Sequence, residues 1–311
     1  MNKPVTPPSL SAASGADASL VTTDVASSNV LSGAESARIK ASLHANGVAV
    51  IRGFIDSERL RQLREDVVAA VSDDFDFGVP YGFELPAKRT PGTSEFFHPF
   101  LFSSAAAALV TSPSLQEIIE DYLGSAAIIH HALFQRSLPV DQPTVDWHVD
   151  TGSNKALNGA SRFPDRRLRM ITYLSDVKSG GLGYILDTRD ATKLFLSRPV
   201  GELFPLSEVP ADPRRRIVIE EPMGTIIFFD AHGLHRPEPP KEDRLVLNTW
   251  FARNDFSAKL PPVLVSVAGV PKENYGSMHV FGNARGIALN NLKRRPVAKK
   301  GLFSSLKGLL R

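Results

Sequence analysis

The pattern of hydrophobic and polar residues divides the chain into a helical first part and a strand-rich second part. Residues 35–45 predict a short helix, and the apolar run 48–54 predicts a buried strand. Asp56 or Ser57 can serve as the N-cap of the next helix. The apolar side chains of that helix share one face, which we expect to pack on the outside of a sheet: Leu60, Leu63, Val67, Ala70 and Val71.

β-Prone runs dominate the chain after a further helix, which is expected to begin at Pro113 and to end at Gly124. These runs are rich in β-branched and aromatic residues, and they predict strands at 126–138, 144–150, 169–174, 182–186, 224–229 and 244–251. Residues 75–102 have no clear period and predict a loop. The expected fold class is therefore mainly β with flanking α.

Two potential metal ligands stand two residues apart on the expected strand 144–150. Side chains alternate along a strand, so His148 and Asp150 should project from the same face. An H-x-D tripeptide occurs by chance in many chains and is weak evidence when it stands alone. A second segment strengthens it, because the apolar run that begins at Gly224 leads into a turn that carries His232 and His235.

Two histidines and one carboxylate on one side of a metal, with other positions open, are typical of non-haem Fe(II) oxygenases. Arg244 stands nine residues after His235 and begins another strand. An arginine there can bind a carboxylate through two parallel hydrogen bonds, which a lysine cannot reproduce.

These segments together resemble the phytanoyl-CoA dioxygenase-like (PhyH) family of Fe(II)/2-oxoglutarate-dependent oxygenases. The resemblance rests on residues 147–150 (WHVD), 180–190 (GGLGYILDTRD) and 229–236 (FDAHGLHR), with Arg244 behind them. Residues 46–54 (NGVAVIRGF) are similar to the early strand of that family. The similarity covers roughly residues 35 to 256 and is carried by the motifs jointly.

The resemblance implies a double-stranded β-helix, or jelly roll, with its core at about 125–256. N-terminal helices would back this core within an oxygenase domain at 34–292. Closure of the two sheets would protect most strand edges.

The resemblance also implies the cofactors and the reaction. His148, Asp150 and His235 would hold Fe(II), and His235 is preferred to His232 as the distal ligand. Arg244 would receive the far carboxylate of 2-oxoglutarate. O2 would then drive hydroxylation of an unactivated C–H bond, with release of succinate and CO2. A carboxylate at 150 argues against the related halogenases, which lack this ligand.

Polar contacts to 2-oxoglutarate are implied for His131 and Gln135, and for Thr172 or Tyr173. For His131 and Gln135 the alternative is a hydrogen bond satisfied within the sheet. Arg166, Arg167 and Arg169 form either a solvated basic face, which is the default interpretation, or a contact to an anionic substrate group.

Two other functional classes remain open. A zinc-dependent hydrolase could use the same three ligands with a metal-bound water as the nucleophile, and it would not need Arg244. A metal-free jelly-roll binding module is the alternative that is not an enzyme.

The formal charge of the 311-residue chain is +3, but it is unevenly distributed. Residues 293–311 contain seven basic and no acidic residues, so the rest of the chain carries 3 − 7 = −4. The body of the protein therefore gives no support to nucleic-acid binding. The absence of cysteine excludes disulfides and thiolate metal sites and is compatible with a reducing cytoplasm. No run of 18 apolar residues is present.

The two ends of the chain differ from its body. Residues 1–33 have the composition of a disordered segment and no signal-peptide pattern. Residues 293–311 predict a basic amphipathic helix, which would lie on an anionic membrane from the cytoplasmic side or dock on protein. A membrane contact would favour a lipid or lipid-linked substrate, whereas a soluble small molecule is equally compatible with the sequence.

Overall fold

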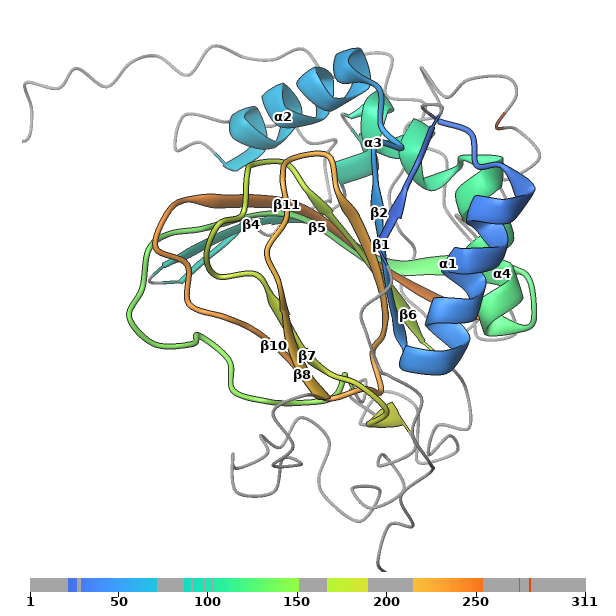
Figure 1. Ribbon diagram of the computed structural model, residues 1–311. Coiled ribbons are helices and arrows are strands. Elements are labelled where there is room, and N and C mark those ends of the chain that lie inside the picture. Colours follow the sequence, from blue (N-terminus) through green and yellow to red (C-terminus); the bar gives the residue numbers. More distant parts are fainter. Residues whose placement is uncertain are drawn as a thin grey trace, which may run out of the picture.

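The computed structural model describes residues 22–26, 29–71, 87–90, 92–97, 99–101, 103–150, 167–189, 215–253, 274 and 280. Two β-sheets face one another, and helices cover the outer side of the larger sheet (Figure 1). The prediction of a mainly β fold with flanking helices is confirmed. The predicted basic tail 293–311 lies outside the described residues, as do nearly all residues of the stretch 257–292.

The larger sheet has eight strands in the order β1-β2-β9-β6-β11-β5-β4-β3. Every neighbouring pair is antiparallel except β1 and β2, which run parallel. Its strands are β1 (Thr22–Asp24), β2 (Val48–Arg52), β3 (Ala87–Thr90), β4 (Thr93–Phe97), β5 (Ala127–Ser137), β6 (Leu168–Tyr173), β9 (Ile226–Asp230) and β11 (Arg244–Arg253). Since β1 lies within the expected disordered segment 1–33, that expectation is wrong for residues 22–24.

The smaller sheet has three antiparallel strands in the order β10-β7-β8. They are β7 (Leu182–Ile185), β8 (Arg216–Ile219) and β10 (His235–Pro237). The chain passes repeatedly between the two sheets, so segments far apart in sequence meet across the space between them.

Four α-helices and one short 3-10 helix are described: α1 (Gly33–Asn46), α2 (Ser57–Val71), η1 (Pro99–Leu101), α3 (Ser104–Val110) and α4 (Pro113–Leu123). A capping box starts α1, because Ser32 accepts from the backbone N–H of Glu35 while Glu35 accepts from that of Ser32. Gly124 ends α4 in the left-handed conformation, as the sequence predicts.

Both faces of the larger sheet are buried. One face packs against the helices in a core that includes Leu63, Ile118 and Phe228. The other face packs against the smaller sheet, with Phe229 and Tyr184 among its members. Phe228 and Phe229 are neighbours on β9 that point to opposite faces, and full burial of each contributes roughly 1.5–3 kcal/mol. The larger sheet is thereby held rigidly on both sides.

Within residues 75–102, which the sequence predicts as a loop, the structure contains the hairpin of β3 and β4. β4 extends the larger sheet beside β5, with Glu95 opposite Gln135. The segment lacks a clear sequence period because the strands are short. The hairpin widens the wall of the space between the sheets.

A register shift interrupts the pairing of β5 with β11. His131 lies opposite Trp250, but the next residue of β11, Phe251, lies opposite Ile129, so β5 has one extra residue. Simple alternation places Ile129 and His131 on the same side. The shift instead puts Ile129 in the core under the helices, together with Ala132.

Among the residues that the structure describes, no helix has both the length and the apolar character needed to span a bilayer.

Candidate metal centre

The segment after β5 and the start of β10, which carry candidate ligands, are joined by their backbones. His148 donates its N–H to the carbonyl of His235 at 3.0 Å, and His235 donates to the carbonyl of His148 at 2.9 Å. Asp150 extends the pairing by donating to the carbonyl of Ala231 at 2.8 Å. His148 therefore forms an isolated bridge with His235, although residues 144–150 do not form the regular strand that the sequence predicts.

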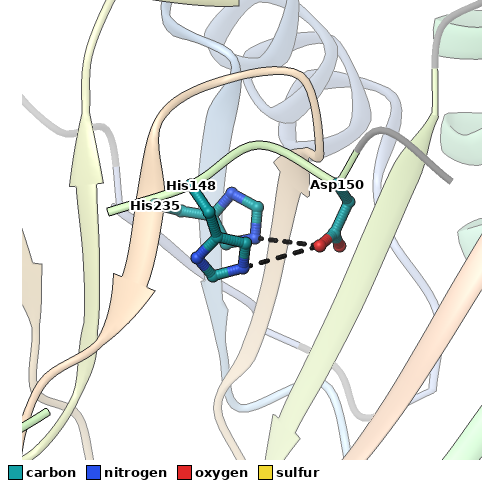
Figure 2. Close-up of side chains that lie close together, drawn as sticks. All are labelled: His148, Asp150 and His235. Atoms are coloured by element: carbon teal, nitrogen blue, oxygen red, sulfur yellow. Dashed lines mark ion pairs between the residues drawn. The ribbon is translucent and has the colours of Figure 1, made fainter. Parts of the chain in front are cut away.

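The bridge brings three candidate ligands to one point (Figure 2). Asp150 Oδ1 lies 3.6 Å from His148 Nε2 and 3.7 Å from His235 Nε2. One ligand atom from each of the three residues lies within 4.8 Å of the other two. The structure thus brings together the three residues that the sequence indicates, and it selects His235 rather than His232.

Both imidazoles are held with Nε2 toward the centre. His148 Nδ1 lies 2.8 Å from the carbonyl oxygen of Asp146, and His235 Nδ1 lies 2.9 Å from that of Gly233. A carbonyl oxygen only accepts, so each Nδ1 carries the proton and donates it. Each Nε2 therefore presents a lone pair, which is the form that binds a metal.

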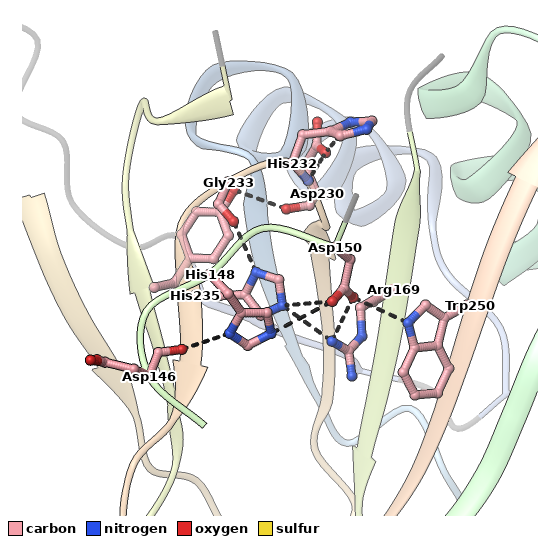
Figure 3. Close-up of polar contacts among 10 residues, drawn as sticks. Asp146, His148, Asp150, Arg169, Asp230, His232, Gly233, His235 and Trp250 are labelled. Carbon is pink, nitrogen blue, oxygen red and sulfur yellow. Dashed lines mark hydrogen bonds and ion pairs between the residues drawn. The ribbon is translucent and has the colours of Figure 1, made fainter. Parts of the chain in front are cut away.

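The second oxygen of Asp150 is held by two donors on the larger sheet (Figure 3). Arg169 Nη1 donates to Oδ2 at 2.7 Å, and Trp250 Nε1 donates to it at 3.2 Å. Burial by itself would raise the pKa of Asp150, but the positive charge of Arg169 beside it holds that pKa well below its usual value. Asp150 is therefore an anion at neutral pH.

His235 is almost completely buried. Burial lowers the pKa of His235 to about 3, and the positive charge of Arg169 acts in the same direction. The neutral imidazole is therefore the stable form.

A cavity of about 690 Å³ extends from the cluster between the two sheets. Arg244 lines it, on the same face of β11 as Val246, Asn248 and Trp250. The Arg244 guanidinium donates from Nη1 to the carbonyl of Gly180 and from Nη2 to Ser137 Oγ at 3.2 Å. Burial lowers the pKa of Arg244, the nearby Tyr173 hydroxyl acts in the opposite direction, and no carboxylate of the described residues pairs with the guanidinium. Its buried Nε has no hydrogen-bond partner in the described part of the chain.

Among the further residues implied as co-substrate contacts, His131, Gln135 and Tyr173 line this cavity. Of the alternatives Thr172 and Tyr173, it is therefore Tyr173 that faces the cavity. Arg169, Ile171 and Tyr173 occupy the cavity face of β6, and strand alternation turns Thr172 toward the opposite face. Thr172 lies opposite Leu247, which belongs to the core beneath the helices. Tyr173 lines the cavity instead.

Arg169 corrects a second expectation. The default interpretation puts it on a solvated basic face, whereas its side chain is 12% exposed and pairs with Asp150. Side-chain alternation along β6 could have predicted this position, because Arg169 and Tyr173 are four residues apart and so point to the same face. In the same way Trp250 and Asn248 lie an even number of residues from Arg244 on β11, so alternation places both of them on the cavity face. Asn248 is buried in the cavity wall.

His232 occupies a different environment from His235. Its backbone N–H donates to Asp230 Oδ1 at 2.9 Å, and its ring Nδ1 lies 3.3 Å from the same oxygen. Asp230 Oδ2 accepts from Tyr122 of α4. Asp230 therefore connects the turn after β9 to helix α4. Because His232 contacts Asp230, it does not join the cluster of candidate ligands.

The donor set fits a divalent cation that prefers nitrogen and oxygen ligands, since two neutral imidazoles and one carboxylate converge. The cavity fits an anionic co-substrate, because it contains a buried guanidinium without an acidic partner among the described residues. Iron(II) and 2-oxoglutarate satisfy both requirements.

Comparison with known proteins agrees with this chemistry. Residues 135–252, from β5 to β11, match the 2OG-Fe(II) oxygenase superfamily. This region contains all three residues of the cluster and Arg244. No curated protein matches the sequence.

The epimerase SnoN, solved in complex with Fe3+, alpha ketoglutarate and nogalamycin RO, superimposes with a TM-score of 0.52. The match has 14% sequence identity and covers 72% of this chain and 85% of SnoN. A second SnoN structure, described as a non-heme alpha ketoglutarate dependent epimerase from nogalamycin biosynthesis, gives 0.49, with 13% identity over 72% and 84% of the two chains. AviO1 from Streptomyces viridochromogenes Tue57 gives 0.46, with 13% identity over 73% and 97%. At such identities the likeness concerns the fold, and the predicted jelly roll is confirmed.

The close packing at Gly233 yields a stability prediction. A Cβ atom at Gly233 would overlap the ring and hydroxyl of Tyr184, so Gly233→Ala is expected to lower the free energy of unfolding by about 1–3 kcal/mol. Urea unfolding measures this change. Gly33→Ala is the matched control, because nothing lies within 4 Å of a Cβ there. Equal stability of the two variants would contradict the packing argument.

The ligand assignment yields a binding prediction. His148→Ala and His235→Ala are expected to weaken Co(II) binding by more than about 100-fold, since even the hydrogen-bond partners of metal ligands typically contribute 10- to 100-fold. Equilibrium dialysis measures the affinity. His44→Ala, at an exposed histidine paired with Asp121, should bind Co(II) like the unchanged protein. Loss of binding in His232→Ala with retention in His235→Ala would refute the assignment.

Proposed function

We propose that this non-haem iron, 2-oxoglutarate-dependent oxygenase hydroxylates an unactivated C–H bond of a small molecule. One observation supports this most directly: a cluster of two histidines and an aspartate shares a cavity with a buried arginine that has no acidic partner among the described residues. A metal site alone would be compatible with many reactions. The additional cation, Arg244, favours a reaction that uses an anionic co-substrate.

When bound, iron(II) and 2-oxoglutarate supply the oxidising chemistry, in which O2 is consumed and succinate and CO2 are released. The role of the chain is to bind and to orient. His148, Asp150 and His235 would hold the metal, and Arg244 would receive the far carboxylate of 2-oxoglutarate. His131 and Gln135 lie on the neighbouring strand, where they would contact the bound molecules.

The walls of the cavity favour a substrate with an apolar or planar surface. The rings of Phe97, His131 and Trp250 pack in sequence along β4, β5 and β11, with centroid distances of 5.3 and 4.6 Å. The cavity volume of about 690 Å³ is in the range of small-molecule sites. A lipid-linked substrate and membrane contact through 293–311 remain predictions, as does membership of the PhyH-like branch.

A zinc hydrolase is the weaker candidate. It needs a metal-bound water but no buried guanidinium at the far end of the cavity. Arg244 carries a desolvation cost that such an enzyme would have no reason to retain.

The co-substrate assignment predicts a specific loss in an Arg244 variant. Anaerobic addition of Fe(II) and 2-oxoglutarate should produce a weak visible charge-transfer band, and titration of this band gives the dissociation constant. Arg244→Ala is expected to weaken 2-oxoglutarate binding by about 10- to 100-fold, the value of one or two hydrogen bonds to a charged group. Arg136→Ala is the matched control, since Arg136 is 41% exposed and pairs with Asp243. A band in Arg244→Ala that titrates as in the unchanged protein would reject the assignment.

The reaction outcome requires a separate test, because SnoN is an epimerase. Screening small molecules for succinate release identifies a substrate. Turnover under ¹⁸O2 should then leave one labelled oxygen atom in the product and one in succinate. A product that has gained no oxygen atom, formed together with labelled succinate, would exclude hydroxylation and indicate another oxidation.

A further inference from the structure

The two carboxylate oxygens of Asp150 face different partners (Figure 3). Oδ1 points toward the histidines, at 3.6 Å from His148 Nε2 and 3.7 Å from His235 Nε2. Oδ2 accepts hydrogen bonds from Arg169 at 2.7 Å and from Trp250 at 3.2 Å. The carboxylate therefore has one oxygen directed to the cluster and one engaged by the sheet.

The two donors are themselves held rigidly. Arg169 and Trp250 are register partners on β6 and β11, so their positions follow from the pairing of these strands. The Arg169 guanidinium carbon lies 4.1 Å from the centroid of the Trp250 ring and 5.1 Å from that of Phe229. Such stacking restricts the guanidinium, and rotation of Asp150 would leave two buried donors without an acceptor.

We infer that Arg169 and Trp250 are positioning residues that restrict Asp150 to a single-oxygen contact with the metal. This inference rests on the proposed function. Three protein atoms leave three positions of a six-coordinate iron free, which suffices for a two-atom co-substrate and O2. An aspartate bound through both oxygens would occupy one of these positions.

Arg169 has a second effect, on the charge of the site. Its Nη1 also lies 3.1 Å from His235 Nε2, so one cation contacts two of the three candidate ligand residues. A cation so close to the metal position repels a divalent ion. Removal of this charge should therefore leave metal affinity unchanged or increased, while 2-oxoglutarate affinity falls.

Crystal structures of the Co(II)-loaded protein and of Co(II)-loaded Arg169→Met test the inference directly. We expect one oxygen of Asp150 on the metal in the unchanged protein and two in Arg169→Met. Equilibrium dialysis should show Co(II) affinity in Arg169→Met that is equal or tighter. Binding of 2-oxoglutarate should be weaker by about 10-fold or more, the effect of removing a cation beside the bound anion. Arg136→Met, outside the cavity, is the control and should behave as the unchanged protein.

A single-oxygen Asp150 in Arg169→Met would overturn the inference. So would two bound oxygens in the unchanged protein, or lost Co(II) binding in folded Arg169→Met. If Arg169→Met does not fold, Trp250→Phe decides, because it keeps an aromatic ring and removes the indole N–H that donates to Asp150. We expect unchanged Co(II) affinity and a second oxygen of Asp150 on the metal in Co(II)-loaded Trp250→Phe, and a single-oxygen Asp150 in that variant would overturn the inference. Failure of the unchanged protein to bind 2-oxoglutarate would count against the proposed function, while the number of Asp150 oxygens on Co(II) would still decide this inference.

Discussion

The reciprocal pair of backbone hydrogen bonds between His148 and His235 is the constraint on which the candidate site depends. It joins the segment after β5 to the start of β10, and each imidazole then donates from Nδ1 to a nearby carbonyl. Both Nε2 atoms are thereby directed inward by main-chain geometry. Because the main-chain pairing does not depend on side-chain identity, the cluster has a scaffold that can tolerate change in the surrounding cavity walls.

Charge balance in the cavity follows from the position of each group along β6 and β11. Asp150 and Arg169 neutralise one another at the end that contains the histidines. Arg244 begins β11, six residues before Trp250 on the same face, and retains its charge without an acidic partner among the described residues. Arg244 thus offers a buried cation in the cavity wall that suits one carboxylate of an anionic molecule.

The helical layer supports the site from behind. Tyr122 of α4 donates to Asp230, and the backbone N–H of Asp230 donates to the carbonyl of Gly47 at 2.7 Å. Since Asp230 is the last residue of β9, these contacts fix the origin of the turn that delivers His235. Helices distant from the cavity therefore contribute to its geometry through one buried carboxylate.

The sequence by itself determined the fold class and indicated His148, Asp150, Arg244 and a histidine of the turn 232–235 as candidate site residues, because their spacing and residue types reflect local chemistry. Only the tertiary structure decided that Arg169 pairs with Asp150, that Thr172 faces the helices and that Ile129 leaves the face of His131. Each of these depends on which strands pair and in what register. Side-chain alternation is a local property that a sequence displays directly, whereas register and bulges arise from contacts between distant segments.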